Sequence, residues 1–107
     1  MNAAKRIRKV DKDQLKDCSF QKPDNNFTDA DLAERNRRLY LAMLMGNNYE
    51  SKVKIVFNTV EGNCEILTVI WATTEKFVLL KGGNSIPLEA IAKVEMDSSQ
   101  QNTNRIF

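Results

Sequence analysis

The chain lacks histidine altogether, and this absence excludes several kinds of active site. Without an imidazole there is no Ser–His or Cys–His pair to activate a nucleophile and no histidine ligand for a metal ion. Glycine is also scarce, and Gly82-Gly83 is not followed by the Lys-Ser/Thr pair and the helix of a phosphate-binding loop. We therefore expect a protein that is not an enzyme, has no metal site and uses no cofactor.

Cysteines and long apolar runs are equally few. Cys18 and Cys64 lie 46 residues apart, so they form no CxxC motif and have no metal-ligand spacing. Such a pair is typical of plain thiols in a reducing compartment. No stretch approaches the roughly 18 apolar residues of a membrane-spanning helix, and the basic N-terminus precedes no apolar signal segment. These absences predict a cytoplasmic protein without a membrane association.

Positive and negative charges are nearly balanced, with 16 Lys and Arg against 14 Asp and Glu. The net charge of +2 is too small to indicate a class of partner. The distribution is less even. Residues 1–16 carry a net charge of +4, whereas residues 49–97 carry −2. The basic leader could hold phosphate groups with a salt-dependent affinity, and the alternative is a tail that only improves solubility.

The length of 107 residues corresponds to one domain. Residues 1–26 are polar, basic and end in turn-forming residues, so we interpret them as a flexible leader. Residues 27–97 contain the periodic apolar patterns and form the predicted domain. Residues 98–107 are interpreted as a loose polar tail.

A helix is predicted over residues 28–45. Thr28 is a suitable N-cap, and Asp31 completes an Asp variant of the capping box. Gly46 is the expected C-cap. The apolar positions expected to be buried against the strands are Leu39, Met43 and Leu44.

From residue 52 onward the apolar period changes to two, which predicts strands. Five short strands are expected, over residues 53–58, 64–72, 76–81, 85–88 and 92–96, with a 3₁₀ turn over residues 89–91 before the last. One helix followed by five short strands predicts a mainly β protein, a small barrel capped by its N-terminal helix.

Two local patterns carry a resemblance to a known family. The run Lys76-Phe77-Val78-Leu79-Leu80-Lys81 and the run Ile86-Pro87-Leu88-Glu89-Ala90-Ile91 resemble strand patterns of the Sm-like family of SH3-type small barrels. The resemblance covers residues 28–97 and implies the fold of that family. It does not carry over the family's RNA site, because Lys76 stands where the base-stacking aromatic residue is expected.

Two functional interpretations remain. In the first, the protein is a nucleic-acid-associated module with RNA as the expected ligand, whose candidate contacts are Lys5, Arg6, Arg8, Lys9, Arg35 and Arg38, with Trp71 as a candidate stacking residue. In the second, it is a protein–protein interaction module without a nucleic-acid role. The structural alternatives are a solvated helix face for the arginines and a core position for Trp71 and Phe77.

The sequence also bears on assembly. Pro87 lies in the predicted strand over residues 85–88 and has no N–H to donate to a neighbouring strand. The resemblance implies rings formed through this strand, so we predict no six- or seven-membered ring but a monomer or small oligomer.

Overall fold

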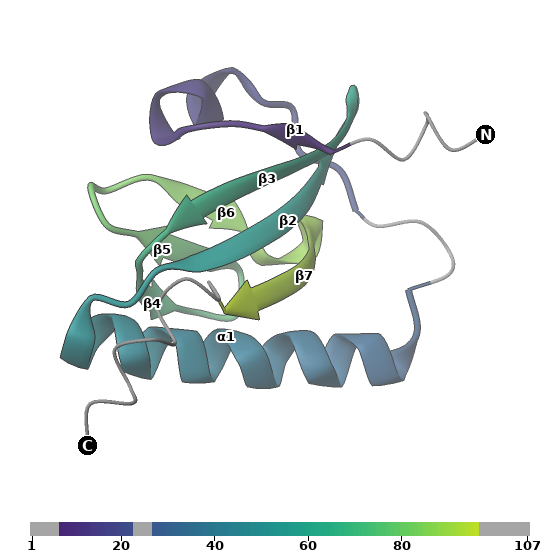
Figure 1. Ribbon diagram of the computed structural model, residues 1–107. Helices are drawn as coiled ribbons and strands as arrows, with labels where there is room; N and C mark the ends of the chain where they lie inside the picture. The colour runs from purple at the N-terminus through teal and green to yellow at the C-terminus, as the bar shows by residue number, and fades with distance from the viewer. Residues whose placement is uncertain (1–6, 23–26, 97–107) are drawn as a thin grey trace.

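The computed structural model describes residues 7–22 and 27–96. Within them, seven strands form two sheets beside one long helix (Figure 1). The elements in chain order are β1 (Arg8–Lys9), the 3₁₀ helix η2 (Lys12–Asp17), α1 (Asp29–Tyr49), β2 (Val53–Thr59), β3 (Gly62–Thr68), β4 (Ile70–Thr73), β5 (Phe77–Leu80), β6 (Ser85–Pro87), the 3₁₀ helix η3 (Leu88–Ala90) and β7 (Ile91–Met96).

The first sheet has the strand order β1-β3-β2-β7 and is built on the β2–β3 hairpin. Its register pairs Ile55 with Ile66 and Phe57 with Cys64, and all four side chains are buried. Gly62, with a φ of 126°, supplies the backbone conformation that the hairpin turn requires. The alternation of apolar and polar residues along β2 therefore places one face of the sheet in the core.

The second sheet has the strand order β4-β5-β6. Only Val69 separates β3 from β4, so the chain passes directly from one sheet into the other. The inward residues of the two sheets form one core with a few residues of the N-terminal segment and α1. Its largest fully buried side chains are Phe57, Leu39, Ile55, Ile70, Leu80, Ile86 and Ile91.

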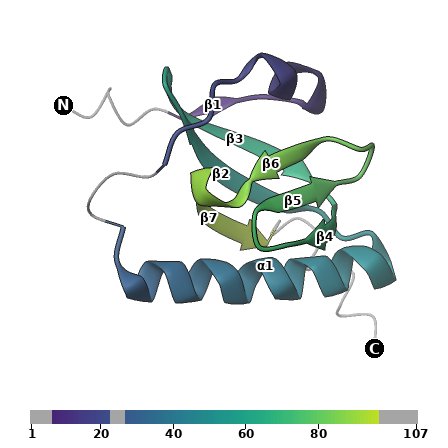
Figure 2. The same ribbon diagram turned by 180° about the vertical axis from the view of Figure 1, so that it is seen from behind.

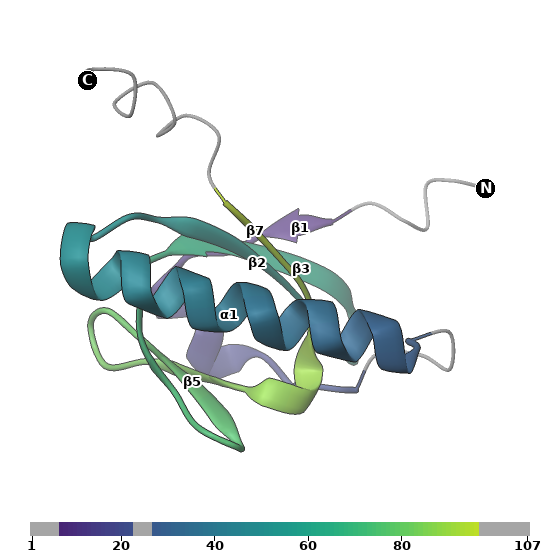
Figure 3. The same cartoon turned by 90° about the horizontal axis from the view of Figure 1, so that it is seen from below.

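Helix α1 begins as predicted, because Thr28 and Asp31 form the capping box. The helix packs against β4 of one sheet and β7 of the other (Figure 3). It does not end at residue 45, so the predicted C-cap is wrong. Gly46 is buried inside the helix, where an added Cβ would lie 2.4 Å from the carbonyl oxygen of Ile70. This glycine serves close packing, and the left-handed C-cap is Glu50.

The predicted five-stranded barrel capped by an N-terminal helix is wrong. The helix lies in the middle of the chain, and the two sheets stay open because, among the described residues, β6 pairs only with β5 and β7 only with β2. The outward carbonyls of β7 are engaged by α1 instead of by another strand. The fold is therefore a mixed helix and sheet structure with two open sheets.

The N-terminal segment also differs from the flexible leader expected over residues 1–26. β1 pairs in parallel with β3, and Val10 and Leu15 are buried in the core. Asp11 caps η2 through a capping box with Gln14. Residues 7–22 therefore belong to the folded unit. Residues 1–6, 23–26 and the predicted tail over residues 98–107 lie outside the described residues.

The expected burial of α1 is only partly correct. Leu39 is buried and Met43 packs against the core, as predicted. Leu44 is 38% exposed, so its predicted burial is wrong. The helix turns only one face, which includes Leu39, Ala42 and Gly46, toward the sheets.

Candidate functional site

Arg35, a candidate phosphate ligand, fastens α1 to the chain around η3. It is only 6% exposed. Its Nη1 donates to the carbonyl oxygens of Leu88 at 3.2 Å and Ile91 at 3.3 Å. The guanidinium also lies 5.4 Å from the centre of the Phe27 ring, a cation–π distance. Burial lowers the pKa of Arg35. These contacts occupy the group internally and leave it little capacity for a ligand.

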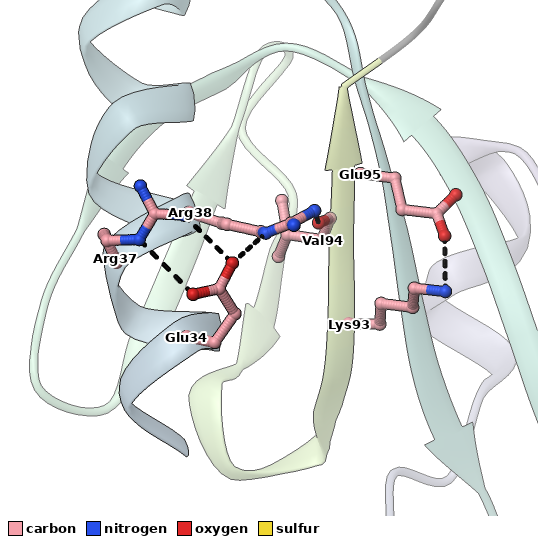
Figure 4. A network of polar contacts seen from close by, with 6 residues as sticks. All are labelled: Glu34, Arg37, Arg38, Lys93, Val94 and Glu95. Atoms are coloured by element: carbon pink, nitrogen blue, oxygen red, sulfur yellow. Dashed lines mark hydrogen bonds and ion pairs between the residues drawn. The ribbon is translucent and has the colours of Figure 1, made fainter. Parts of the chain in front are cut away.

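Arg38 makes a similar internal contact. Its Nη1 donates to the carbonyl oxygen of Val94 at 3.2 Å, and its Nε donates to Glu34 at 2.6 Å (Figure 4). Arg37 donates to the same carboxylate at 3.0 Å. The hydrogen bonds from Arg37 and Arg38 lower the pKa of Glu34 from 4.5 to about 2. The positive charges of Arg37 and Arg38 are therefore partly neutralised by Glu34, and Arg38 is also bound to β7.

The basic leader divides into residues with different surroundings. Lys5 and Arg6 lie outside the described residues. Arg8 is exposed, but its Nη2 donates to the Sγ of the buried Cys64 at 3.4 Å and lies 4.0 Å from Glu61. Lys9, the next residue, lies at the edge of a groove that the sequence did not reveal. Of the four predicted basic residues that the structure describes, only Lys9 lines this groove.

We call this feature the lysine groove. Its volume is about 630 Å³. The segments that line it, among them the β1–η2 segment, the end of α1 and the turn after β5, can be followed in Figure 1. Five lysines from three separate parts of the chain line the groove, together with three carboxylates and several apolar residues. The lysines are Lys9, Lys12, Lys52, Lys54 and Lys81, the acids are Asp11, Glu50 and Glu65, and the apolar residues include Val10, Ile66, Leu67 and Val69.

The charge of the lysine groove is positive, since five lysines face three carboxylates. Lys81 pairs with Glu50 at 2.6 Å, and Lys54 pairs at 3.6 Å with Glu95, which does not line the groove. Lys9 and Lys12 make no ion pair with any residue that the structure describes. These two ammonium groups are therefore available to an anionic ligand.

Local geometry brings Lys12 to this groove. The β5–β6 turn passes beside it through Gly82, whose φ is 99°. A Cβ at Gly82 would lie 3.2 Å from the Nζ of Lys12, tighter than an ordinary contact. Gly82 therefore supplies the left-handed conformation of the turn, and the side chain of Lys12 lies beside it.

Trp71, the candidate stacking residue, is 42% exposed on β4. Phe77 and Leu79 on β5 are 48% and 38% exposed, so the alternative of a core position is wrong for both Trp71 and Phe77. The second sheet lies nearest the viewer in Figure 2, with α1 beneath it. None of these three residues lines the lysine groove. They form a separate apolar feature on the outside of this sheet.

Within residues 7–22 and 27–96, no group of three or more Cys, Asp or Glu side chains is placed to hold a metal ion. None of the described helices is long and apolar enough to cross a membrane. A second cavity of about 510 Å³ lies at the opposite end of β2 and includes Gln21, Asn58 and Asn63.

No family model, curated protein or solved structure matches the chain. The resemblance to the Sm-like family therefore stays a prediction from the local patterns.

The lysine groove could not be predicted from local sequence patterns. Lys52 and Lys54 occupy the polar positions of a strand pattern, where lysines are ordinary surface residues. Lys81 follows β5 by one residue and shows no basic cluster around it. Only the docking of the N-terminal segment on β3 brings these residues together with Lys9 and Lys12.

Proposed function

We propose that this chain is a non-catalytic nucleic-acid-binding protein and that the lysine groove holds the phosphates of its ligand. The observation that carries the proposal is the convergence of five lysines from three parts of the chain on one groove. Lysine binds phosphate as a point charge and needs no fixed two-point geometry. The site that we propose shares Lys9 with the site expected from the sequence and otherwise consists of different residues.

The form of the groove supports an extended polyanion. Lys9 and Lys12 line it without a described ion-pair partner, and Lys81 lines it while paired with Glu50 at 2.6 Å. The lining also includes apolar residues, of which Leu67 is 50% exposed. Grooves that follow a single-stranded backbone combine positive charge with apolar contact surface in this way. RNA is the polyanion that we propose to test first.

The test is a titration of the full-length chain with labelled single-stranded RNA over a series of salt concentrations. We expect affinity to fall with salt and Lys9→Glu/Lys12→Glu to weaken binding by about tenfold or more at low salt. The slope of log affinity against log salt becomes smaller by about 1 to 2, since about 0.7 counterions are released per phosphate contact on a single strand. Deleting residues 1–26 is unsuitable, because Val10 and Leu15 belong to the core.

The matched control is Lys16→Glu/Lys22→Glu, which changes the net charge equally at two lysines that do not line the groove. Its affinity is expected to stay within about threefold of the wild type, because exposed charges at a distance are screened. The proposal is contradicted if the wild type fails to bind at low salt or if both double variants weaken binding to the same extent.

A protein–protein interaction module is the second candidate, and the exposed set of Trp71, Phe77 and Leu79 favours it. Exposed apolar groups of this kind mark interaction sites in many proteins. Trp71 is the single tryptophan, so its fluorescence reports on this surface. An emission change on saturation with RNA would assign the surface to the nucleic acid, whereas unchanged emission would leave it to a protein partner.

A further inference from the structure

The two cysteines of the chain are distant in sequence but pack against the same core. Cys64 is a residue of β3 and is only 1% exposed. Cys18 is half-buried at the C-terminal end of η2 and contacts the hydrophobic core to which Cys64 belongs. Both are free thiols, and neither lines the lysine groove. The site described above therefore leaves both sulfur atoms without a role.

The chain that follows η2 explains the position of Cys18. Phe20 forms a bridge with Thr59, and its ring lies 5.6 Å from the ring of Phe57. Phe57 is in turn the direct partner of Cys64 across the β2–β3 pair. The backbone of Cys18 is extended, with a φ of −85° and a ψ of 139°. Residues two apart in an extended segment lie on the same side, so Cys18 and Phe20 both face this part of the sheet.

Arg8 lies beside the two sulfur atoms. It is the neighbour of Cys64 in the β1–β3 pair, and its Nη2 donates to the Sγ of Cys64 at 3.4 Å. This hydrogen bond raises the pKa of Arg8, and the nearby Cys18 acts in the same direction. The side chain of Arg8 is 54% exposed. The sulfur of Cys64 thus lies at the border of the core, next to a group that reaches the solvent.

The two thiols also influence each other electrostatically. Burial raises the pKa of Cys18, and the proximity of Cys64 raises it further. Since the thiolate is the nucleophilic form of cysteine, the reactivity of Cys18 should increase as the pH rises above neutrality. Packing, strand register and electrostatics therefore all place Cys18 and Cys64 side by side.

We propose that Cys18 and Cys64 form a reversible intrachain disulfide when the folded protein meets a small disulfide such as oxidised glutathione. The more accessible Cys18 attacks the small disulfide as a thiolate, forms a mixed disulfide and releases one thiol. The Cys64 thiolate then attacks the sulfur of Cys18 and releases the second thiol. The two electrons and two protons lost by the cysteines are thus recovered in two molecules of the reduced small thiol.

The bond has a structural consequence that can be measured. It joins residues 46 positions apart and closes a loop that contains α1 and β2. A disulfide across a loop of this length should raise the melting temperature by about 10 °C or more. The inference does not depend on the proposed nucleic-acid function.

The test is incubation of the folded, full-length chain with oxidised glutathione at about pH 8, where more of the thiol is ionised. Acid quenching, intact-mass spectrometry and thiol titration then identify the product. We expect a monomer that has lost two hydrogen atoms, carries no glutathione and has no free thiol. Its melting temperature should be higher than that of the reduced chain, and dithiothreitol should reverse both changes.

The matched control is Cys18→Ser/Ser19→Cys, which moves the thiol by one residue to an exposed position. Neighbouring residues of an extended segment point to opposite sides, so this variant should stop at the mixed disulfide with glutathione. Circular dichroism verifies that its fold is retained. A wild type that keeps both thiols, stops at the mixed disulfide or forms only intermolecular disulfides would overturn the inference. A control that closes the intrachain bond as fast as the wild type would also overturn it.

Discussion

Replacing Gly46 by alanine sets two effects of opposite sign against each other. In the interior of an exposed helix, alanine is more favourable than glycine by about 1 kcal/mol. Here the new Cβ would lie 2.4 Å from the carbonyl oxygen of Ile70 and 3.1 Å from Cγ1 of Val69. The first obstacle belongs to the main chain and cannot rotate away, so α1 would have to move off β4.

We expect the contact to decide the outcome. Overpacking costs about 1 to 3 kcal/mol and occasionally more, and an obstacle in the main chain places Gly46→Ala at the upper end of that range, so the net loss of unfolding free energy should be about 2 kcal/mol after the gain of about 1 kcal/mol in helix propensity. In a domain of this size each 1 kcal/mol lowers the melting temperature by about 4 to 8 °C. Urea unfolding followed by the fluorescence of Trp71 measures the free energy.

Asn47→Ala provides the control, since Asn47 is the next residue of the same helix and is exposed. It should be neutral or stabilising by about 0.5 kcal/mol, because only helix propensity changes. If Gly46→Ala is as stable as the wild type or more stable, then α1 does not pack on β4 as closely as described.

Two further predictions concern stability. Leu39→Ala should lower the free energy of unfolding by about 2 to 4 kcal/mol because the side chain is buried. Leu44→Ala should lower it by less than about 1 kcal/mol in dilute solution. Equal losses for the two variants in urea unfolding would contradict the assignment of Leu39 to the buried face of the helix. The pKa of Glu34 in the folded protein is about 2, below its ordinary value of 4.5. Its ion pairs therefore stabilise the fold fully above the pKa of the unfolded state, and this contribution is lost as the pH falls toward about 2. The difference in urea midpoint between wild type and Glu34→Gln should therefore shrink over this pH range, and a constant difference would show that the ion pairs do not stabilise the fold.

Much of the local structure could be predicted because local interactions determine it. The capping box of Thr28 and Asp31 defines the start of the helix. The alternation of apolar and polar residues predicts β2 and its hairpin. The N-terminal segment could not be predicted in the same way. Val10 and Leu15 are single apolar residues among charges, and their burial depends on pairing with β3, more than 50 residues later in the chain.

The candidate site was harder to predict for the same reason. Arg35 and Arg38 have the sequence features of exposed basic residues, and only the position of β7 turns them into internal hydrogen-bond donors. The lysines of the lysine groove, in contrast, are scattered in sequence and lie close together only in the folded protein. The prediction that the strands close into a barrel was also wrong, because local patterns do not determine which strand edges remain unpaired.

The contact between α1 and β7 has a consequence for the behaviour of the protein at high concentration. An exposed edge strand offers free carbonyl groups to strands of other molecules, which is a route to aggregation. On β7, the carbonyls of Ile91 and Val94 already accept hydrogen bonds from Arg35 and Arg38. A strand approaching from another molecule would first have to displace both guanidinium groups and the helix that carries them. The two arginines thus shield the last strand from growth of an intermolecular sheet.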